Sequence, residues 1–572
     1  MKKNILKTML LGILGCLFTS CFSDLDTMPL DDNELVSEKV YQTADGYTGV
    51  LAKCYSSLIL TGQKGGDGGD GDLEGANEGY SGYVRLMFYL QELPTDNFIM
   101  PSSSNGLRKC LNLQWDASNA SVIRWTYQRL YMSIAYCNEL LRECTESKLK
   151  SRGLWNELGG ECASYRAEAR FIRAYCYATL CDLFGGVPYI DENTGVKDIP
   201  QQWTRKQIFD FAESELLAID TDLKAPGENV YGRIDRVAAW FLLSRMYINA
   251  ESWTGENRYN DALKYAKMVI NDGTYPLAPD YRTIFLADND KCSEIIWPLV
   301  QDGLRAQSSA GTNFYTKAFV NGPMNELYKT GVGSRGWGNV RAKTTLVDAF
   351  DAQDVIFDPN DTWGDKKMDK RAQFMTALPN QTKNTWDEKG NMTSTFTCGY
   401  GYIKWRNVNR DNSLPEQGDA YSSIDFPLFR SAEAYLIAAE AILRGANGTM
   451  DEALGYVNEI RERAYMSGKY AKDGVRSDVS GDIQMSDLNL DFIPHCPKTA
   501  PTSAAWPQTS CAATTWTGCT STTISTPIPW RGSPFPIPRP TPRIATALTT
   551  STIGGATMSI LLSRCSATAS TP

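Results

Sequence analysis

Apolar residues recur at the 3.6-residue spacing of an amphipathic α-helix in three parts of the chain. These parts are residues 166–183, 238–250 and 431–443. A further helical pattern follows the second part at 259–271, and another follows the third part at 451–464. Glycines stand after several of these patterns, as is typical of the carboxyl ends of helices. The sequence therefore predicts a chain made mainly of α-helices.

The second and third parts share a helix–turn–helix layout. Small residues such as Ala238 and Ala438 lie on these helices, and small side chains permit close helix crossings. The layout resembles a tetratricopeptide helix pair, a unit that buries its apolar face by stacking on its neighbours. An earlier pair is expected around residues 122–143 and 154–183, and Thr204 is a suitable N-cap for another helix.

Two long segments lack a clear helical pattern. Residues 62–82 are rich in glycine and aspartate, and residues 275–425 hold many Gly, Asn, Asp, Trp and Tyr residues. Segments of this length inside a folded chain are usually functional loops or disordered regions. The aromatic content favours ordered loops. We therefore expect residues 275–425 to form an irregular insert that contributes a ligand-binding face.

The amino terminus has the features of an export signal. A basic start is followed by an apolar run at 9–18, which is too short to span a bilayer. Small residues then precede Cys21. This arrangement resembles the lipobox of a bacterial lipoprotein and implies a signal peptide at 1–20 and lipidation of Cys21. An ordinary secretory signal with an incidental cysteine is the alternative.

The segment after Cys21 indicates where the anchored protein would face. Asp24, Asp26, Asp31 and Asp32 resemble the surface-export signal of Bacteroidetes lipoproteins. No other segment is apolar enough to span a membrane. We therefore expect a protein that is lipid-anchored in the outer membrane and faces outside the cell.

Composition narrows the classes of function. The net charge of −9 argues against nucleic acid as a partner, because phosphate binding needs a basic surface. His495 is the single histidine, which excludes multi-histidine metal sites and argues against Ser-His or Cys-His catalysis. Catalysis by paired carboxylates remains possible on composition alone. The 15 cysteines form an odd, irregular set without a C-x-x-C pair, which favours buried free thiols over a disulfide framework.

A series of motifs behind the lipobox resembles the SusD/RagB family of Bacteroidetes outer-membrane lipoproteins. The strongest is RAEARFIRAY at 166–175, followed by LFGGVPY at 183–189. Further motifs are Gly232-Arg233, FPLFRSAE at 426–433, and the helical pattern at 451–464. The resemblance extends to about residue 493 and covers most of the chain.

This resemblance implies a fold, a partner and a role. The fold is a mostly α, right-handed superhelical scaffold of tetratricopeptide-like pairs over residues 21–493, with a large irregular ligand-binding face. The partner is a SusC-like TonB-dependent transporter, and the role is the non-enzymatic capture of oligosaccharides for that transporter. Two alternatives stay open: import of peptide or another non-sugar nutrient, and glycoside hydrolysis by paired carboxylates.

Aromatic and polar residues of the irregular segments are the candidate ligand-binding residues, because aromatic planes stack on sugar rings. Trp337 is the strongest stacking candidate, since glycines flank it on both sides, although its ring could instead pack against the helical body. Asp96, Asn97 and Arg335 are candidates for hydrogen bonds to hydroxyl groups. The other stacking candidates are Tyr80, Tyr83, Tyr315 and Trp363.

The loop at 65–72 (GGDGGDGD) alternates glycine and aspartate. Alternating carboxylates can bind Ca²⁺, but a bidentate Glu is missing at EF-hand spacing. A plain flexible loop is the alternative interpretation. Apart from this possible Ca²⁺ site, the sequence predicts no cofactor.

The composition changes sharply after about residue 493. Thr, Ser, Pro and Ala dominate residues 494–572, which is typical of a disordered, mucin-like tail. The resemblance implies instead a helix rich in Glu and Arg and an Arg-Arg-x-Asp-Leu motif. When the reading frame is shifted by one base, codons that encode residues 510–517 (SCAATTWT) can instead encode LRRNDLDR, which contains this motif. This supports the hypothesis of a change of reading frame near residues 494–498. A resequenced gene that keeps the printed frame would contradict this hypothesis.

Overall fold

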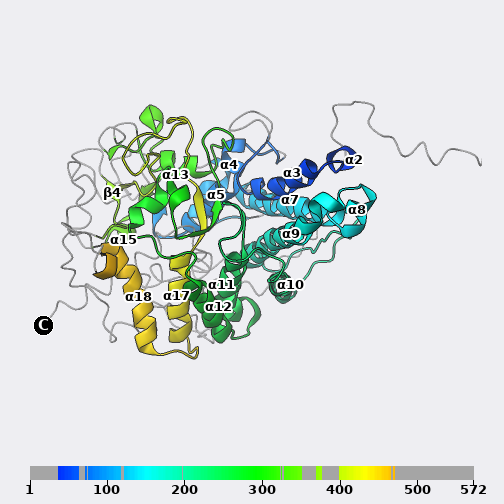
Figure 1. Cartoon of the computed structure of the whole chain (residues 1–572). Helices are drawn as coiled ribbons and strands as arrows, with labels where there is room; N and C mark the ends of the chain where they lie inside the picture. Colours follow the sequence, from blue (N-terminus) through cyan, green and yellow to red (C-terminus); the bar gives the residue numbers. More distant parts are fainter. Residues whose placement is uncertain are drawn as a thin grey trace, which may run out of the picture.

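Long α-helices dominate the part of the chain that the structure, a computed structural model, describes (Figure 1). That part comprises residues 37–62, 71–73, 75–102, 104–116, 121–195, 197–321, 324, 328–348, 350, 369–375, 399–465 and 468–470. The strands within it are short and pair two by two. The predicted mostly α fold is therefore confirmed.

The long helices form a continuous stack in which each helix contacts the next. This arrangement is the one expected of tetratricopeptide-like pairs, which bury their apolar faces against their neighbours. In order along the stack, the helices are α3 (Ala44–Ser56), α7 (Ser121–Glu143), α9 (Trp155–Phe184), α10 (Arg205–Ala218), α11 (Arg236–Thr254), α12 (Tyr259–Asp272), α17 (Ser431–Leu443) and α18 (Met450–Tyr465).

Shorter elements connect and cover this stack. The short helices are α2 (Ser37–Val40), α4 (Glu78–Ser81), α5 (Tyr83–Met87), η2 (Phe88–Glu92), η3 (Ser104–Gly106), α6 (Leu107–Leu111), α8 (Glu146–Ser151), η4 (Tyr281–Phe285), η5 (Asn289–Lys291), α13 (Thr312–Ala318), η6 (Gly333–Arg335), α15 (Thr344–Val347) and η7 (Gly468–Tyr470). The strands are β1 (Phe98–Ile99), β2 (Ile295–Leu299), β3 (Arg341–Ala342), β4 (Phe374–Met375), β5 (Gly401–Tyr402) and β6 (Phe426–Arg430). The antiparallel pairs are β1–β3, β2–β6 and β4–β5.

Local sequence signals fix several helix ends. Thr204 is the N-cap of α10 and forms a capping box with Gln207, which confirms the predicted cap. Gly255 and Gly273 follow α11 and α12 with φ angles of 83° and 78°. Only glycine adopts this left-handed conformation without steric cost, and it lets the chain reverse directly after a helix.

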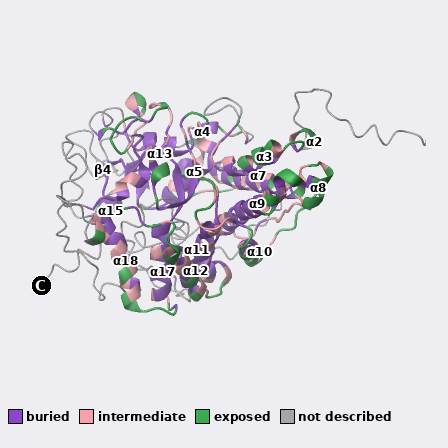
Figure 2. Cartoon of the chain, viewed as in Figure 1, coloured by how far each residue is buried: buried purple, intermediate pink, exposed green. Residues whose placement is uncertain are grey.

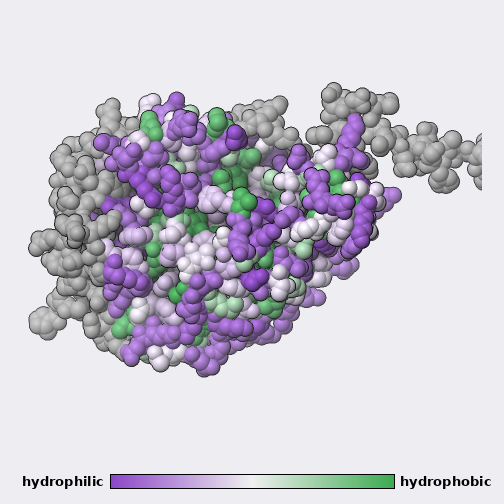
Figure 3. Space-filling model, in the orientation of Figure 1, coloured by the Kyte–Doolittle hydropathy of each residue, from purple (hydrophilic) through white to green (hydrophobic). Residues whose placement is uncertain are grey.

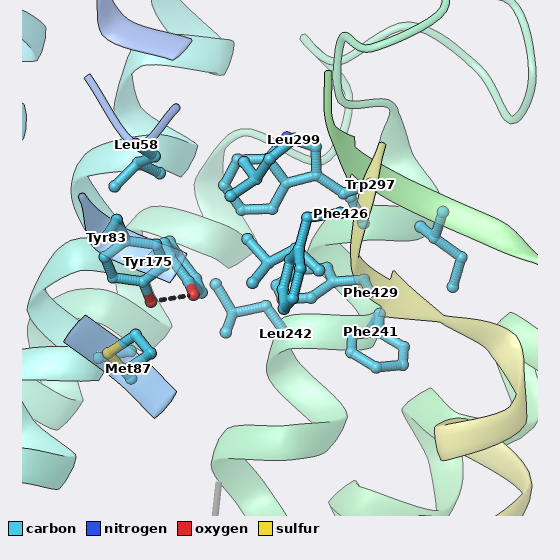
Figure 4. Packing of buried hydrophobic residues seen from close by; sticks show 14 of the residues in the cluster. Leu58, Tyr83, Met87, Tyr175, Phe241, Leu242, Trp297, Leu299, Phe426 and Phe429 are labelled. Atoms are coloured by element: carbon cyan, nitrogen blue, oxygen red, sulfur yellow. Dashed lines mark hydrogen bonds between the residues drawn. The ribbon is translucent and has the colours of Figure 1, made fainter. Parts of the chain in front are cut away.

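Aromatic side chains fill the core between the stack and the β2–β6 pair (Figure 4). The Trp297 ring on β2 lies 5.3 Å from Phe171 and 5.0 Å from Tyr175, both on α9, measured between centroids. Phe429 on β6 lies 5.2 Å from Trp297 and 4.6 Å from Phe241 on α11. These edge-on and tilted contacts hold the two strands against α9 and α11.

Buried ion pairs join the motifs that are far apart in the sequence. Glu168 of the RAEARFIRAY motif is fully buried and accepts two hydrogen bonds from Arg233, at 2.9 and 2.5 Å. Glu433 of the FPLFRSAE motif accepts two hydrogen bonds of 2.7 Å from Arg245 on α11. A buried carboxylate is stable only when it is paired, so each pair fixes the spacing of two segments.

Glu294 connects three parts of the chain from a fully buried position directly before β2. Its carboxylate accepts hydrogen bonds from Arg430 at 2.6 Å, from Arg463 at 2.5 Å and from the Ala278 amide at 3.0 Å. Burial alone would raise the pKa of this carboxyl, but the two guanidinium groups outweigh burial and lower the pKa of Glu294. Glu294 therefore ties β2 and β6 to α18.

The described part of the chain has a buried interior and a mainly polar exterior. Buried residues line the packed sides of the helices, and exposed residues gather on outer turns and loops (Figure 2). The face in view is mainly hydrophilic, with apolar residues in small scattered groups (Figure 3). Among the helices that the structure describes, none combines the length and the apolar character needed to cross a membrane.

The replacement Glu294→Gln is expected to lower the free energy of unfolding by about 3 kcal/mol, because it leaves two buried guanidinium groups without a counter-charge. Since the pKa of Glu294 is lower in the folded chain than in the unfolded chain, its ionic contribution is complete above about pH 4.3. The contribution disappears as the pH falls through the folded-state pKa. Chemical unfolding at pH 7 and at successively lower pH should therefore show a shrinking difference between Glu294→Gln and the original protein.

Glu146→Gln is the control for this measurement. It removes the exposed i,i+4 pair with Lys150, whose two side chains are 61% and 55% exposed. Such pairs contribute little to stability. Equal unfolding midpoints for Glu294→Gln and Glu146→Gln would contradict the assigned role of Glu294.

Candidate ligand-binding surface

Tyr80 lies in a short helix that a buried arginine holds in place. Asn77 caps the amino end of α4 by accepting a hydrogen bond from the Gly79 amide at 3.0 Å. At the other end, Arg129 of α7 donates to the Ser81 carbonyl at 3.1 and 3.0 Å. The same fully buried side chain binds Asp72 through two hydrogen bonds. The partly exposed Tyr80 ring is thus presented on a fixed support.

Arg85 is buried among aromatic rings next to Tyr80. Its guanidinium carbon lies 4.2 Å from the Tyr80 ring centroid, 4.8 Å from Phe314 and 5.4 Å from Trp337. Its nitrogens donate to the Tyr89 hydroxyl and to the Gly79 carbonyl. A guanidinium group over ring faces is attracted by their electron density, so Arg85 stabilises the positions of both the Tyr80 ring and the Trp337 ring.

Backbone hydrogen bonds place Trp337 against the end of α13. The Trp337 amide donates to the Lys317 carbonyl at 2.7 Å, and the Gly338 amide donates to the Val320 carbonyl at 2.7 Å. Gly336 permits this approach, because a Cβ at that position would lie 2.7 Å from the Val320 carbonyl oxygen. The Trp337 ring is partly exposed and packs against the core on its inner side.

Two residues linked to Trp337, Lys317 through a backbone hydrogen bond and Arg335 along the chain, make polar contacts with residues 419–421. Arg335 is exposed and forms an ion pair of 2.5 Å with Asp419. Lys317 donates to the Ala420 carbonyl at 2.7 Å, and its ammonium nitrogen lies 5.7 Å from the ring centroid of the partly exposed Tyr421. We call Tyr80, Trp337 and Tyr421, with the Arg335–Asp419 pair, the aromatic surface.

Three of the predicted ligand-binding residues are buried. Tyr83 and Tyr315 are 2% and 5% exposed, and their rings pack in the core. The Tyr83 hydroxyl pairs with that of Tyr175 (Figure 4). Asn97 is 1% exposed and contacts Glu92 at the start of the β1–β3 pair. Their burial removes these three side chains from direct contact with a ligand in this structure.

The remaining candidates are placed differently. Asp96 is exposed beside the buried Asn97. Burial lowers the pKa of Lys343, and the negative charge of Asp96 partly opposes this effect. Trp363 and Cys21 lie outside the described residues, as does most of the glycine- and aspartate-rich loop. Asp72 of that loop is described and is bound by Arg129.

The chemistry offered by the aromatic surface is that of binding. Partly exposed rings supply flat apolar faces, and the paired Arg335 and Asp419 side chains supply a hydrogen-bond donor and an acceptor. Within the described residues, there is no group of three or more His, Cys, Asp or Glu side chains that could hold a metal ion.

Comparison with known proteins gives the family. Residues 293–489 match the family described as "SusD family", and residues 76–248 match the one described as "Starch-binding associating with outer membrane". The chain is 32% identical to the "Starch-binding protein SusD" of Bacteroides thetaiotaomicron over 82% of this chain and 85% of that protein. The chain belongs to the SusD family. A "SusD-like protein P25" of Formosa agariphila is 25% identical over 52% of this chain and 55% of that protein.

Solved structures of SusD superfamily proteins share the fold. A SusD superfamily protein from Parabacteroides distasonis matches with a TM-score of 0.53 and 20% identity, over 78% of this chain and 83% of that chain. "Surface glycan-binding protein A" from Bacteroides uniformis matches with a TM-score of 0.52 and 22% identity, over 76% and 83%. At these identities the likeness concerns the SusD fold alone.

Arg85 and Tyr421 were missed by the sequence-based reasoning. Arg85 interrupts an apolar run from Tyr83 to Met87, and a single charge in such a run was a usable signal that a partner lies nearby. Tyr421 carried no comparable signal, because its position depends on contacts with the distant α13. The SusD-family motifs themselves contribute to the scaffold rather than to the aromatic surface.

Proposed function

We propose that this SusD-family protein binds oligosaccharides at the aromatic surface. The observation that carries the proposal is the relationship to a starch-binding protein over most of both chains. The geometry supports it, because Tyr80 and Trp337 are partly exposed rings that both lie against Arg85. Sugar rings stack their C–H faces on such planes, while Arg335 and Asp419 are positioned to bind hydroxyl groups.

The proposed activity is binding without turnover. The single histidine at 495 argues against histidine-dependent hydrolysis, and the aromatic surface offers the paired Arg335 and Asp419 rather than two adjacent carboxyl groups. Release of shorter sugars from a bound oligosaccharide would contradict this part of the proposal.

The proposed location is the outer face of the outer membrane, with Cys21 as the lipid-bearing residue. The lipobox-like segment and the family description of outer-membrane association support this location. The proposed partner is a SusC-like TonB-dependent transporter that receives the bound oligosaccharide. A TonB-dependent transporter gene beside the gene for this protein is expected on that basis.

The replacement Trp337→Ala is expected to weaken oligosaccharide binding roughly tenfold, because it removes a stacking contact of about 1.4 kcal/mol. The measurement is titration calorimetry of the purified protein, first with a malto-oligosaccharide and then with a panel of other glycans. Trp155→Ala is the matched control, because the partly exposed Trp155 also lies under a cation, with the Lys150 nitrogen 5.2 Å from its ring. This control should bind like the original protein.

Two results would contradict the binding proposal. One is the absence of binding to every glycan of the panel together with binding to peptides, which would favour the import of another nutrient. The other is equal loss of affinity in Trp337→Ala and Trp155→Ala, which would place the binding site elsewhere.

The replacement Cys21→Ala is expected to abolish lipidation and to release the protein from the outer-membrane fraction. Cys16→Ala is the control, because Cys16 lies within the apolar run of the signal. Cell fractionation with immunoblotting measures the location of each variant. Co-purification of a TonB-dependent transporter with the anchored protein tests the proposed partner. Retention of Cys21→Ala in the outer-membrane fraction would contradict the assigned anchor.

A further inference from the structure

Two cysteine thiols meet where the end of α7 approaches the first turns of α9. Cys144 directly follows α7, and Cys162 lies in the second turn of α9. Their sulfur atoms are 3.8 Å apart, and the Cys162 sulfur also lies 3.7 Å from the Cys144 carbonyl oxygen. A disulfide requires a sulfur separation of about 2.05 Å, so an approach of less than about 2 Å would join them.

Hydrogen bonds on both sides hold the two backbones in this arrangement. Arg166, one turn after Cys162, donates to the carbonyls of Leu141 and Cys144 at 2.7 and 2.9 Å. Glu143 beside Cys144 accepts hydrogen bonds from Lys148 and Arg152 at 2.5 and 2.6 Å. The end of α7 is therefore fixed to α9 through Arg166 and to the α8 segment through Glu143.

The two thiols differ in exposure and in the direction of their pKa shifts. Cys162 is 8% exposed and Cys144 is 1% exposed. The hydrogen bond from Cys144 lowers the pKa of Cys162, burial opposes this effect, and the charge of Arg166 lowers the pKa further, to about 7. The same hydrogen bond and burial raise the pKa of Cys144. The greater exposure and the lowered pKa both favour Cys162 over Cys144 as the attacking thiol.

Cys292 provides a comparison at the same exposure. It is 9% exposed, and burial raises its pKa to about 11. A thiol with a raised pKa is a poor nucleophile at neutral pH, since only the thiolate attacks. The difference between Cys162 and Cys292 therefore comes from the neighbouring thiol and Arg166 rather than from solvent access.

We propose that Cys144 and Cys162 are a redox-active pair that forms a reversible disulfide across α7 and α9. The oxidant is a small-molecule disulfide. The Cys162 thiolate attacks one of its sulfurs and releases one thiolate, which forms a mixed disulfide. Cys144 then loses its proton and attacks the Cys162 sulfur, which releases the second thiolate. Two electrons pass from the pair to the oxidant, which leaves as two thiols.

The disulfide would close the segment that contains α8 and would hold the outer end of the α7–α9 pair. A cross-link over a short loop stabilises a protein mainly by restricting its unfolded state. The occurrence of the disulfide in cells rests on the proposed location outside the cytoplasm, where disulfides persist. Its chemistry in the purified protein does not depend on that location.

The test treats the purified full-length protein with oxidised glutathione at neutral pH, blocks the remaining thiols and maps the peptides by mass spectrometry. The expected product is a linked pair of peptides that contain Cys144 and Cys162. The thermal midpoint should rise by roughly 5 °C and return to its starting value after reduction. Cys292→Ser is the control and should form the same link.

Single replacements test the assigned roles. Cys144→Ser should stop at a glutathione adduct on Cys162, because the second thiol is missing. Cys162→Ser should leave Cys144 largely unmodified, because Cys144 is 1% exposed and its burial raises its pKa even without the Cys162 thiol. Adducts of equal yield on the two single variants would overturn this order of attack.

Two outcomes separate a failure of the Cys144–Cys162 redox pair from a failure of the proposed function. Failure of the folded, purified protein to form the link overturns the redox pair, whatever the protein binds. In a second experiment, free thiols are alkylated in intact cells before the protein is purified. A disulfide that forms with glutathione in the purified protein but is absent from these cells supports the redox pair and contradicts the proposed location. Oligosaccharide titration remains an independent readout, because neither cysteine belongs to the aromatic surface.

Discussion

The buried carboxylate of Glu294 holds the β2–β6 strand pair against α18 in this SusD-family chain. It accepts hydrogen bonds from Arg430 of β6, from Arg463 of α18 and from the backbone at Ala278. An unpaired buried charge would destabilise the fold, so the two arginine contacts stabilise this arrangement. The strand pair β2–β6 therefore has one position relative to α18, and its Trp297 and Phe429 rings have one position against α9 and α11.

The aromatic surface depends on that placement. The segment between β2 and β6 contains α13 and Trp337, and both of its ends are held by the strand pair. The region around α4 and α5 supplies Tyr80 and Arg85 from the other side. Gly82 permits the two parts to meet, because a Cβ there would lie 2.5 Å from the Ala310 Cβ. The rigid scaffold thus brings together rings that are more than 250 residues apart.

Helical elements were predictable because their information is local. The periodic patterns at 238–250 and 431–443 lie within α11 and α17, and the Thr204 cap depends on residues only three positions apart. The prediction of buried free thiols is also confirmed for the described cysteines, all of which are free and buried. The predicted lipid anchor and change of reading frame lie outside the described residues and stay predictions.

The candidate ligand-binding residues were less predictable, because exposure in an irregular segment depends on distant contacts. Trp337 and Tyr83 are both aromatic residues near glycines, yet Trp337 is partly exposed and Tyr83 is buried against Tyr175. The pairing of Cys144 with Cys162 likewise requires α7 and α9 to lie antiparallel. Neither outcome is encoded in the spacing of the residues concerned.

A crystal structure of the protein with a bound oligosaccharide tests the central claim most directly. The account predicts a sugar ring in van der Waals contact with Trp337, at about 4 Å, and a second contact with Tyr80 or Tyr421. The Arg85 guanidinium is expected to keep its place against the Tyr80 and Trp337 rings. A sugar bound at a different surface, with the Trp337 ring free of ligand, would contradict the account.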